Sequence, residues 1–82
     1  MVTVAYDQHF ESILKKIKNE DLKERIKKQI RKVINDPEAG KPMRYIRKDT
    51  REVKIPPFRL SYAYLKNQDK IIFLDLYHKD EQ

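Results

Sequence analysis

The spacing of apolar side chains changes about halfway along the chain. Near the start, Val2, Val4 and Tyr6 alternate with small or polar residues, which is typical of a short strand. Two longer stretches then follow the spacing of one face of an amphipathic helix. Their apolar positions are Phe10, Ile13, Leu14 and Ile17 in the first, and Leu22, Ile26, Ile30, Val33 and Ile34 in the second. The pattern therefore predicts one strand followed by two helices.

Polar residues mark the ends of these helices. Asp7 stands where a capping side chain is expected before the first helix. Residues 19–21 separate the two helices, and Asp21 followed by Glu24 resembles a capping box for the second. Pro37 ends the second helix, because the residue before a proline disfavours the helical conformation.

Beyond Gly40 and Pro42 the apolar spacing becomes two, which predicts strands. The expected strands cover residues 43–46, 51–55, 58–65 and 70–77, with turns at 56–57 and 66–69. Helices grouped in sequence before a run of hairpins favour an α+β fold. We therefore predict one domain over residues 1–82, with an N-terminal strand, a two-helix hairpin and an antiparallel sheet of three to four strands.

Alternation along the strands predicts which side chains face the helices. The core face of residues 58–65 should carry Phe58, Leu60, Tyr62 and Tyr64, so Arg59 points the other way. If Val53 faces the helices, Glu52 and Lys54 join Arg59 on the open face. Residues 70–77 are mostly apolar on both faces, which is typical of an interior strand. One face should hold Ile72, Leu74 and Leu76, and the other Ile71, Phe73, Asp75 and Tyr77.

Composition excludes several classes of protein. The 82 residues contain no cysteine, so a disulfide framework, a zinc ribbon and a thiol nucleophile are excluded. No apolar run approaches 18 residues, and the start of the chain lacks the features of a signal peptide. The expected location is the cytoplasm, without membrane association. The sequence offers no spacing for metal ligands and no glycine-rich phosphate loop, so we expect no metal and no cofactor.

Positive charge is concentrated in the middle of the chain. The net charge is +6, and residues 41–59 carry seven basic side chains against two acidic ones. This block also holds four of the six arginines, whose forked donors match phosphate. A nucleic acid is therefore the expected partner, although lysine-rich helices such as those predicted here more often present a solvated face.

Three side chains of the predicted sheet suit the cleavage of an RNA phosphodiester. Such cleavage needs a base, fixed cations beside the charged phosphorane, and an acid for the leaving oxygen. Lys54 and Arg59 offer cations, and His78 offers acid or base chemistry. The alternative is that all three are ordinary polar positions on a half-solvated sheet. His9 lies in the first predicted helix and is expected to be a surface or capping residue.

The motifs in the second half resemble the RelE/ParE superfamily of type II toxin–antitoxin toxins. The resemblance rests on REVKIPPFRLSYAY and KIIFLDLYHKDEQ following a strand and two helices, and it covers nearly the whole chain. RelE-branch members are mRNA interferases that cut mRNA in the ribosomal A site without a metal. ParE-branch members poison DNA gyrase instead.

The resemblance implies roles for individual residues. Lys54 resembles a catalytic strand lysine, Arg59 the phosphate-stabilising arginine, and His78 the C-terminal histidine of some members. The chain departs from the family where Asp80 stands near the place of a late catalytic arginine, where the Pro56–Pro57 bend is shorter, and where Gln82 ends the sequence before a tyrosine or helix found in many relatives. The expected RNA-binding residues are Arg44, Tyr45, Arg47, Lys48, Arg51, Tyr77 and Lys79.

The function implied is that of a toxin that acts as a metal-independent, ribosome-dependent mRNA endonuclease. Two alternatives remain open: a ParE-like gyrase poison and a non-catalytic nucleic-acid-binding module. The implied partners are mRNA, the ribosome with its 16S rRNA, and a cognate antitoxin in a hetero-oligomer. We expect the antitoxin to be acidic and partly disordered, with a helix across the two helices or the open sheet face.

Overall fold

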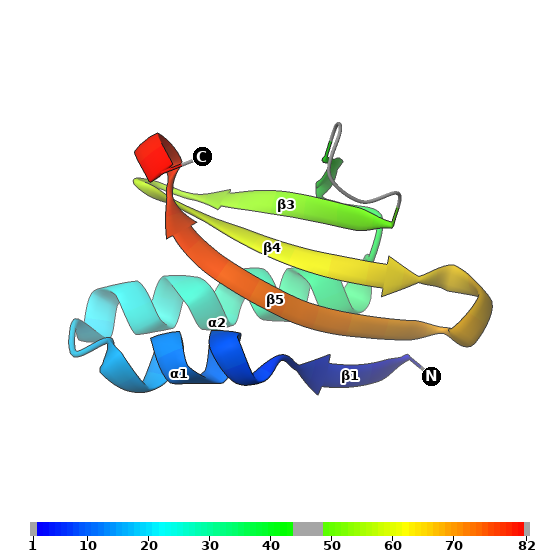
Figure 1. Cartoon of the computed structure of the whole chain (residues 1–82), viewed down its shortest axis with the longest axis horizontal. Coiled ribbons are helices and arrows are strands. Elements are labelled where there is room, and N and C mark those ends of the chain that lie inside the picture. Colours follow the sequence, from blue (N-terminus) through cyan, green and yellow to red (C-terminus); the bar gives the residue numbers. More distant parts are fainter. Residues whose placement is uncertain (1, 44–48, 82) are drawn as a thin grey trace.

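The computed structural model describes residues 2–43 and 49–81, and the elements follow the predicted order (Figure 1). The change in apolar spacing after Gly40 thus marks the change from helices to strands. The elements are β1 (Thr3–Tyr6), α1 (Gln8–Lys16), α2 (Glu20–Asn35), β2 (Lys41–Pro42), β3 (Thr50–Ile55), β4 (Phe58–Leu65) and β5 (Lys70–His78), with short 3₁₀ turns at Lys66–Gln68 and Lys79–Glu81.

The strands form one five-stranded sheet in the order β1-β5-β4-β3-β2. β1 pairs with β5 in parallel, and the other pairs are antiparallel. The α+β class is confirmed. The sheet has five strands rather than three to four, because β1 joins its edge in parallel with β5. α1 packs against β5 and α2 against β3, so the helices cover one face and leave the other open (Figure 1).

Both helices begin with a side-chain cap. Asp7 caps α1 as predicted, and its Oδ2 accepts a hydrogen bond of 3.0 Å from the His9 backbone N–H. α2 begins earlier than predicted. Asn19 Oδ1 accepts a bond of 3.0 Å from the Leu22 N–H, so Asn19 is the cap and the prediction of Asp21 was wrong. None of the helices in the described part of the chain is long and apolar enough to cross a membrane.

The strand expected at residues 43–46 differs from the one observed. β2 consists of Lys41 and Pro42, which pair with Glu52 and Arg51 of β3. Residues 44–46 lie outside the described residues. The Met43 N–H donates to the Thr50 carbonyl oxygen at 3.0 Å, so the hydrogen bonding to β3 continues past Pro42. Pro42 is tolerated because it lies on the edge strand of the sheet.

The core lies between the sheet and the helices. Its helical part includes the buried side chains of Phe10, Ile26 and Val33. The predicted core face of β4 is confirmed: Leu60 and Tyr62 are fully buried, and the other two members pack against them in half-buried positions.

A bulge in β5 changes which of its side chains face the core. Tyr62 pairs with Phe73, whereas the preceding Ser61 pairs with Asp75, so Leu74 is an extra residue on β5. Leu76 therefore joins Phe73 in the core, and the side chains beyond the bulge face the opposite way from the prediction. The predicted division of faces was wrong past Phe73 because strict alternation has no place for an extra residue.

The buried hydroxyl of Tyr62 fixes the loop that leads into β2. It donates to the Pro37 carbonyl oxygen at 2.8 Å and accepts from the Gly40 N–H at 2.9 Å. A Cβ at Gly40 would lie 2.7 Å from this hydroxyl and 2.8 Å from the Glu52 carbonyl oxygen, so only glycine fits. Burial raises the pKa of Tyr62 above its ordinary value of 10.0, because the charged form would lose its hydration.

Candidate nucleic-acid site on the open sheet face

Three neighbouring strands place polar side chains in one row on the open face. Lys54 of β3 is the register partner of Arg59 of β4, and Arg59 is the partner of Tyr77 of β5. Side chains of paired residues lie on the same face of a sheet. The prediction that Lys54 and Arg59 share the open face therefore agrees with the register, and the bulge brings Tyr77 to the same face.

Glu52 links this row by two hydrogen bonds. Its Oε1 accepts from Arg59 Nη1 at 2.8 Å, and its Oε2 accepts from the Tyr77 hydroxyl at 2.6 Å. The Glu52 and Arg59 side chains are only 17% and 27% exposed, so this pair is more strongly held than a typical surface ion pair. Alternation along β3 predicts Glu52 on this face. Its link to Tyr77 was not predicted, because the bulge that turns Tyr77 toward Glu52 has no signal in the sequence.

His78 lies apart from this row. Its register partner is Phe58, one position from Arg59, so it belongs to the face that packs against the helices. The rings of His78 and Phe58 meet edge to face with centroids 5.7 Å apart, at the end of β5. His78 Nδ1 accepts a bond of 3.3 Å from the Asp80 N–H and lies 3.5 Å from its carboxylate. The structure thus brings together two of the three predicted catalytic residues and leaves the third at the sheet end, 35% exposed.

The other expected RNA-binding residues are spread over several places. Arg51 pairs in register with Tyr62, so it lies on the helix-covered side. Its Nη1 donates to the carbonyl oxygens of Glu38 at 3.2 Å and Gly40 at 2.8 Å, which gives it a structural role in the loop before β2. Lys79 is exposed after β5, beyond the row that contains Arg59. The predicted residues Arg44, Tyr45, Arg47 and Lys48 lie outside the described residues.

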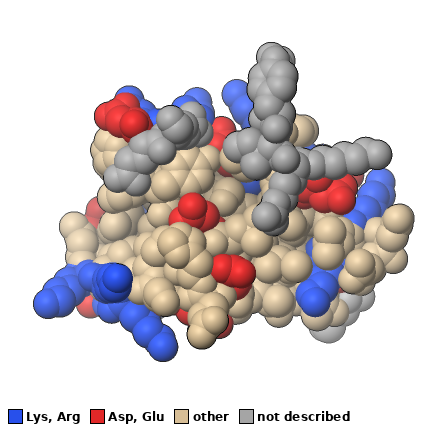
Figure 2. Space-filling model, viewed as in Figure 1, with Lys and Arg blue, Asp and Glu red and all other residues tan. Residues whose placement is uncertain are grey.

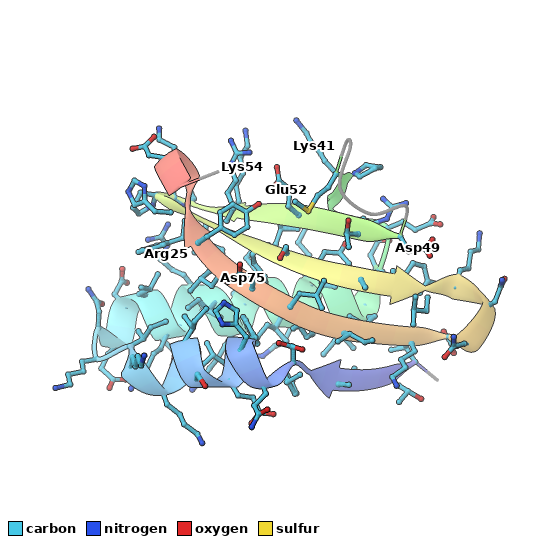
Figure 3. All side chains as sticks on the ribbon, viewed as in Figure 1. Arg25, Lys41, Asp49, Glu52, Lys54 and Asp75 are labelled. Carbon is cyan, nitrogen blue, oxygen red and sulfur yellow. The ribbon has the colours of Figure 1, made fainter. Side chains whose placement is uncertain are left out.

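Charge on the open face is mixed rather than uniformly basic. In Figure 2 uncharged side chains cover most of this view, acidic groups lie near its middle, and Lys and Arg lie toward its margins. Figure 3 labels Glu52 and Asp75 among the strands. Asp75 Oδ1 lies 3.1 Å from Nε2 of His9, whose side chain is 64% exposed on α1, as expected for a surface histidine. Within the described residues no group of three or more His, Asp and Glu side chains is arranged to hold a metal ion.

The fold is similar to that of solved bacterial toxins. The isolated RelE toxin of E. coli superposes with a TM-score of 0.80 at 20% identity, covering 95% of this chain and 84% of that one. The toxin in the intact E. coli RelBE toxin–antitoxin complex gives 0.79 at 20% identity, with 95% and 96% covered. A toxin–antitoxin complex of the RelBE type from Mycobacterium tuberculosis gives 0.78 at 20% identity, with 95% and 98% covered.

Sequence comparison supplies the family. A search among curated proteins finds no match. The family model described as the ParE toxin of the type II toxin–antitoxin system parDE matches residues 3–82, nearly the whole chain. This match agrees with the fold and with the strand motifs REVKI and FRLSY. The chain therefore belongs to the ParE toxin family of type II toxin–antitoxin systems, within the RelE/ParE superfamily.

Proposed function

We propose that this toxin is an endoribonuclease that cleaves mRNA in the ribosomal A site without a metal ion. The observation that carries the proposal is the pairing of Lys54 with Arg59 on the open face, with Arg59 held by Glu52. A phosphorane carries more negative charge than the phosphodiester from which it forms. Cations fixed beforehand therefore stabilise the transition state more than the bound substrate.

Arg59 can serve this purpose while it is bound to Glu52. A guanidinium has five N–H donors in a planar fork, and the hydrogen bond to Glu52 uses Nη1. The remaining donors are available to two oxygens of a phosphate. In this proposal Glu52 is a positioning residue that fixes the plane of the guanidinium, and the exposed Lys54 supplies a second cation from the next strand.

The proposed reaction transfers the phosphoryl group within the RNA. The 2′-oxygen attacks phosphorus as a base takes its proton, and the bond to the 5′-oxygen breaks as an acid protonates that oxygen. We assign acid or base work to His78. Its place at the end of β5, on the other face from Arg59, means that the RNA would have to pass around the end of the sheet to reach it. The role of His78 therefore needs a test separate from that of Arg59.

The gyrase-poison alternative is favoured by two observations. The matching family model carries the ParE description, and Glu52 offsets the charge of the open-face arginine. In that function the toxin acts by binding a protein–DNA complex, so no transition state needs stabilising. It predicts that Arg59 and Lys54 are dispensable for harm to the cell.

An antitoxin is the second proposed partner. The solved relatives from E. coli and Mycobacterium tuberculosis form toxin–antitoxin complexes, and this chain carries a net charge of +6. We propose an acidic antitoxin that assembles with this toxin in the cytoplasm, where ribosomes are found. Complementary charge would speed association and make the complex sensitive to salt.

The test is primer-extension mapping of mRNA on programmed ribosomes incubated with purified toxin. The wild type should cut in the A-site codon, and Arg59→Ala should lower the cleavage rate by about two to three orders of magnitude, as removal of one transition-state donor does elsewhere. Arg31→Ala removes an exposed arginine of α2 and is the matched control, with unchanged cleavage expected. Absence of cuts together with inhibition of gyrase supercoiling would replace this proposal by the alternative.

A further inference from the structure

A groove runs along the outer edge of β3, where this strand faces α2. It is lined by Gln29, Lys32, Ala39, Lys41, Glu52, Val53 and Lys54. Its volume of about 260 Å³ lies below the roughly 300–1,000 Å³ of pockets that enclose drug-sized ligands. The size suits a segment of a chain passing through rather than a small molecule enclosed within it.

Three lysines from three different elements line this groove. Lys32 comes from α2, Lys41 from β2 and Lys54 from β3. Figure 3 shows Lys41 and Lys54 projecting from the same edge of the sheet. Among the described residues, none of these three lysines forms an ion pair within 4.0 Å.

Three of the described lysines outside the groove have acidic partners. Lys23 and Lys27 pair along α2 with glutamates three residues earlier, and Lys66 pairs with Glu38. The acidic side chain of the groove, Glu52, directs both carboxylate oxygens to Arg59 and Tyr77. Among the described residues, the groove thus gathers three lysines and one carboxylate, and this excess of positive charge favours an anionic ligand.

The groove is also continuous with the row on the open face. Lys54 lines the groove and is the register partner of Arg59, so a chain that contacts Arg59 can cross the β3 edge beside Lys54. Among the described residues, β2 pairs with β3 only at Arg51 and Glu52. No described strand covers the outer edge of β3 from Val53 onward.

We propose that this groove binds the phosphodiester backbone of single-stranded RNA next to the segment held by Arg59. The inference rests on the proposed function for the choice of RNA, and it adds Lys32 and Lys41 to the predicted site residues. Lysine is a flexible point charge that contacts phosphate without reading bases. The groove should thus add affinity without sequence preference.

The test measures binding apart from cleavage. Fluorescence anisotropy with a short unstructured RNA is recorded in an Arg59→Ala background over a range of salt concentrations, with Lys32→Ala and Lys41→Ala as groove variants. The salt slope is the slope of the logarithm of the binding constant against the logarithm of the salt concentration. Each lost phosphate contact should reduce its magnitude by about 0.7, so at a salt concentration tenfold below 1 M the affinity should be about fivefold lower. The control Lys16→Ala removes an exposed lysine of α1, on the β5 side of the fold, and should change neither quantity beyond long-range charge effects.

The outcomes separate this inference from the proposed function. Reduced slopes for the groove variants alone would support the groove, even if wild-type toxin fails to cut mRNA on ribosomes and the nuclease proposal falls. Slopes equal to that of Lys16→Ala, or no binding of RNA at all, would overturn the groove even if A-site cleavage occurs. A poly-glutamate peptide and unlabelled RNA are also compared as competitors, at concentrations expressed as negative charges. If the peptide displaces the labelled RNA at the lower concentration, the RNA proposal is overturned in favour of an acidic protein segment.

Discussion

The hydroxyl of Tyr62 offers the sharpest test of how the fold holds β2 beside β3. Tyr62→Phe keeps the ring among its core neighbours and removes only the oxygen. The Gly40 N–H, which is buried, then loses its 2.9 Å partner, and the Pro37 carbonyl loses a donor at 2.8 Å. An unsatisfied buried donor costs about 1–3 kcal/mol, and a lost neutral hydrogen bond about 1 kcal/mol.

The expected destabilisation is therefore about 2–3 kcal/mol, which is a large part of the roughly 5–15 kcal/mol typical of a domain. For a chain of this length each kcal/mol lowers Tm by about 4–8 °C, so Tm should fall by at least about 8 °C. Urea unfolding followed by circular dichroism measures the free energy, and the m-value shows whether the native state stays compact.

The matched control is Tyr64→Phe, on the same face of β4. Tyr64 is half-buried, and the described residues offer its hydroxyl no hydrogen bond. Removing the Tyr64 hydroxyl should lower the free energy of unfolding by less than about 0.5 kcal/mol, as at other positions without a buried partner. If Tyr62→Phe and Tyr64→Phe destabilise the protein equally, the hydroxyl does not fix the loop and the reasoning fails.

Four further predictions follow from the same contacts. Because the pKa of Tyr62 is raised on folding, its contribution to stability should be full below pH 10 and be lost as pH rises through the folded pKa, and Tyr62→Phe should flatten this part of the pH–stability curve. Gly40→Ala should destabilise by about 1–3 kcal/mol, since the backbone oxygen 2.8 Å away is hard to move; unchanged urea unfolding would contradict this. Glu52→Gln should lower kcat on ribosomes about tenfold with little change in KM, because Arg59 loses its orientation; a rise in kcat would mean that Glu52 competes with the substrate. His78→Gln should remove one limb of the pH–rate profile, and an unchanged profile would exclude His78 as acid or base.

Local patterns predicted the elements and much of the core. The change of period after Gly40 separates helices from strands, and alternation along β4 placed Leu60 and Tyr62 inside. The position of β1 beside β5 could not be predicted, because parallel pairing between distant segments leaves no local pattern. The bulge at Leu74 is equally silent in sequence, since no glycine or proline marks it.

The arrangement of the candidate site could be predicted in the strands without a bulge but not beyond it. Lys54 and Arg59 follow simple alternation across a two-residue turn, so their meeting on the open face could be read from the sequence. Tyr77 and His78 lie past the bulge, and each is on the face opposite to the one that alternation gives. A site shared by three strands is therefore only as predictable as the register of its least regular strand.

Two kinds of positive charge lie next to each other around β3. One is the arginine that Glu52 holds on the open face, and the other is the set of three groove lysines, which form no ion pair with any described residue. A surface that only attracts a polyanion gains nothing from a carboxylate beside its arginine, because the carboxylate lowers the local potential. A site that must present donors in one geometry as charge develops does gain from it, since a fixed donor needs no reorganisation during the reaction. Glu52 lowers the positive potential beside Arg59 but fixes the orientation of the guanidinium, which favours chemistry at Arg59 and binding at the lysines. The Glu52→Gln and Lys32→Ala variants test these two roles independently.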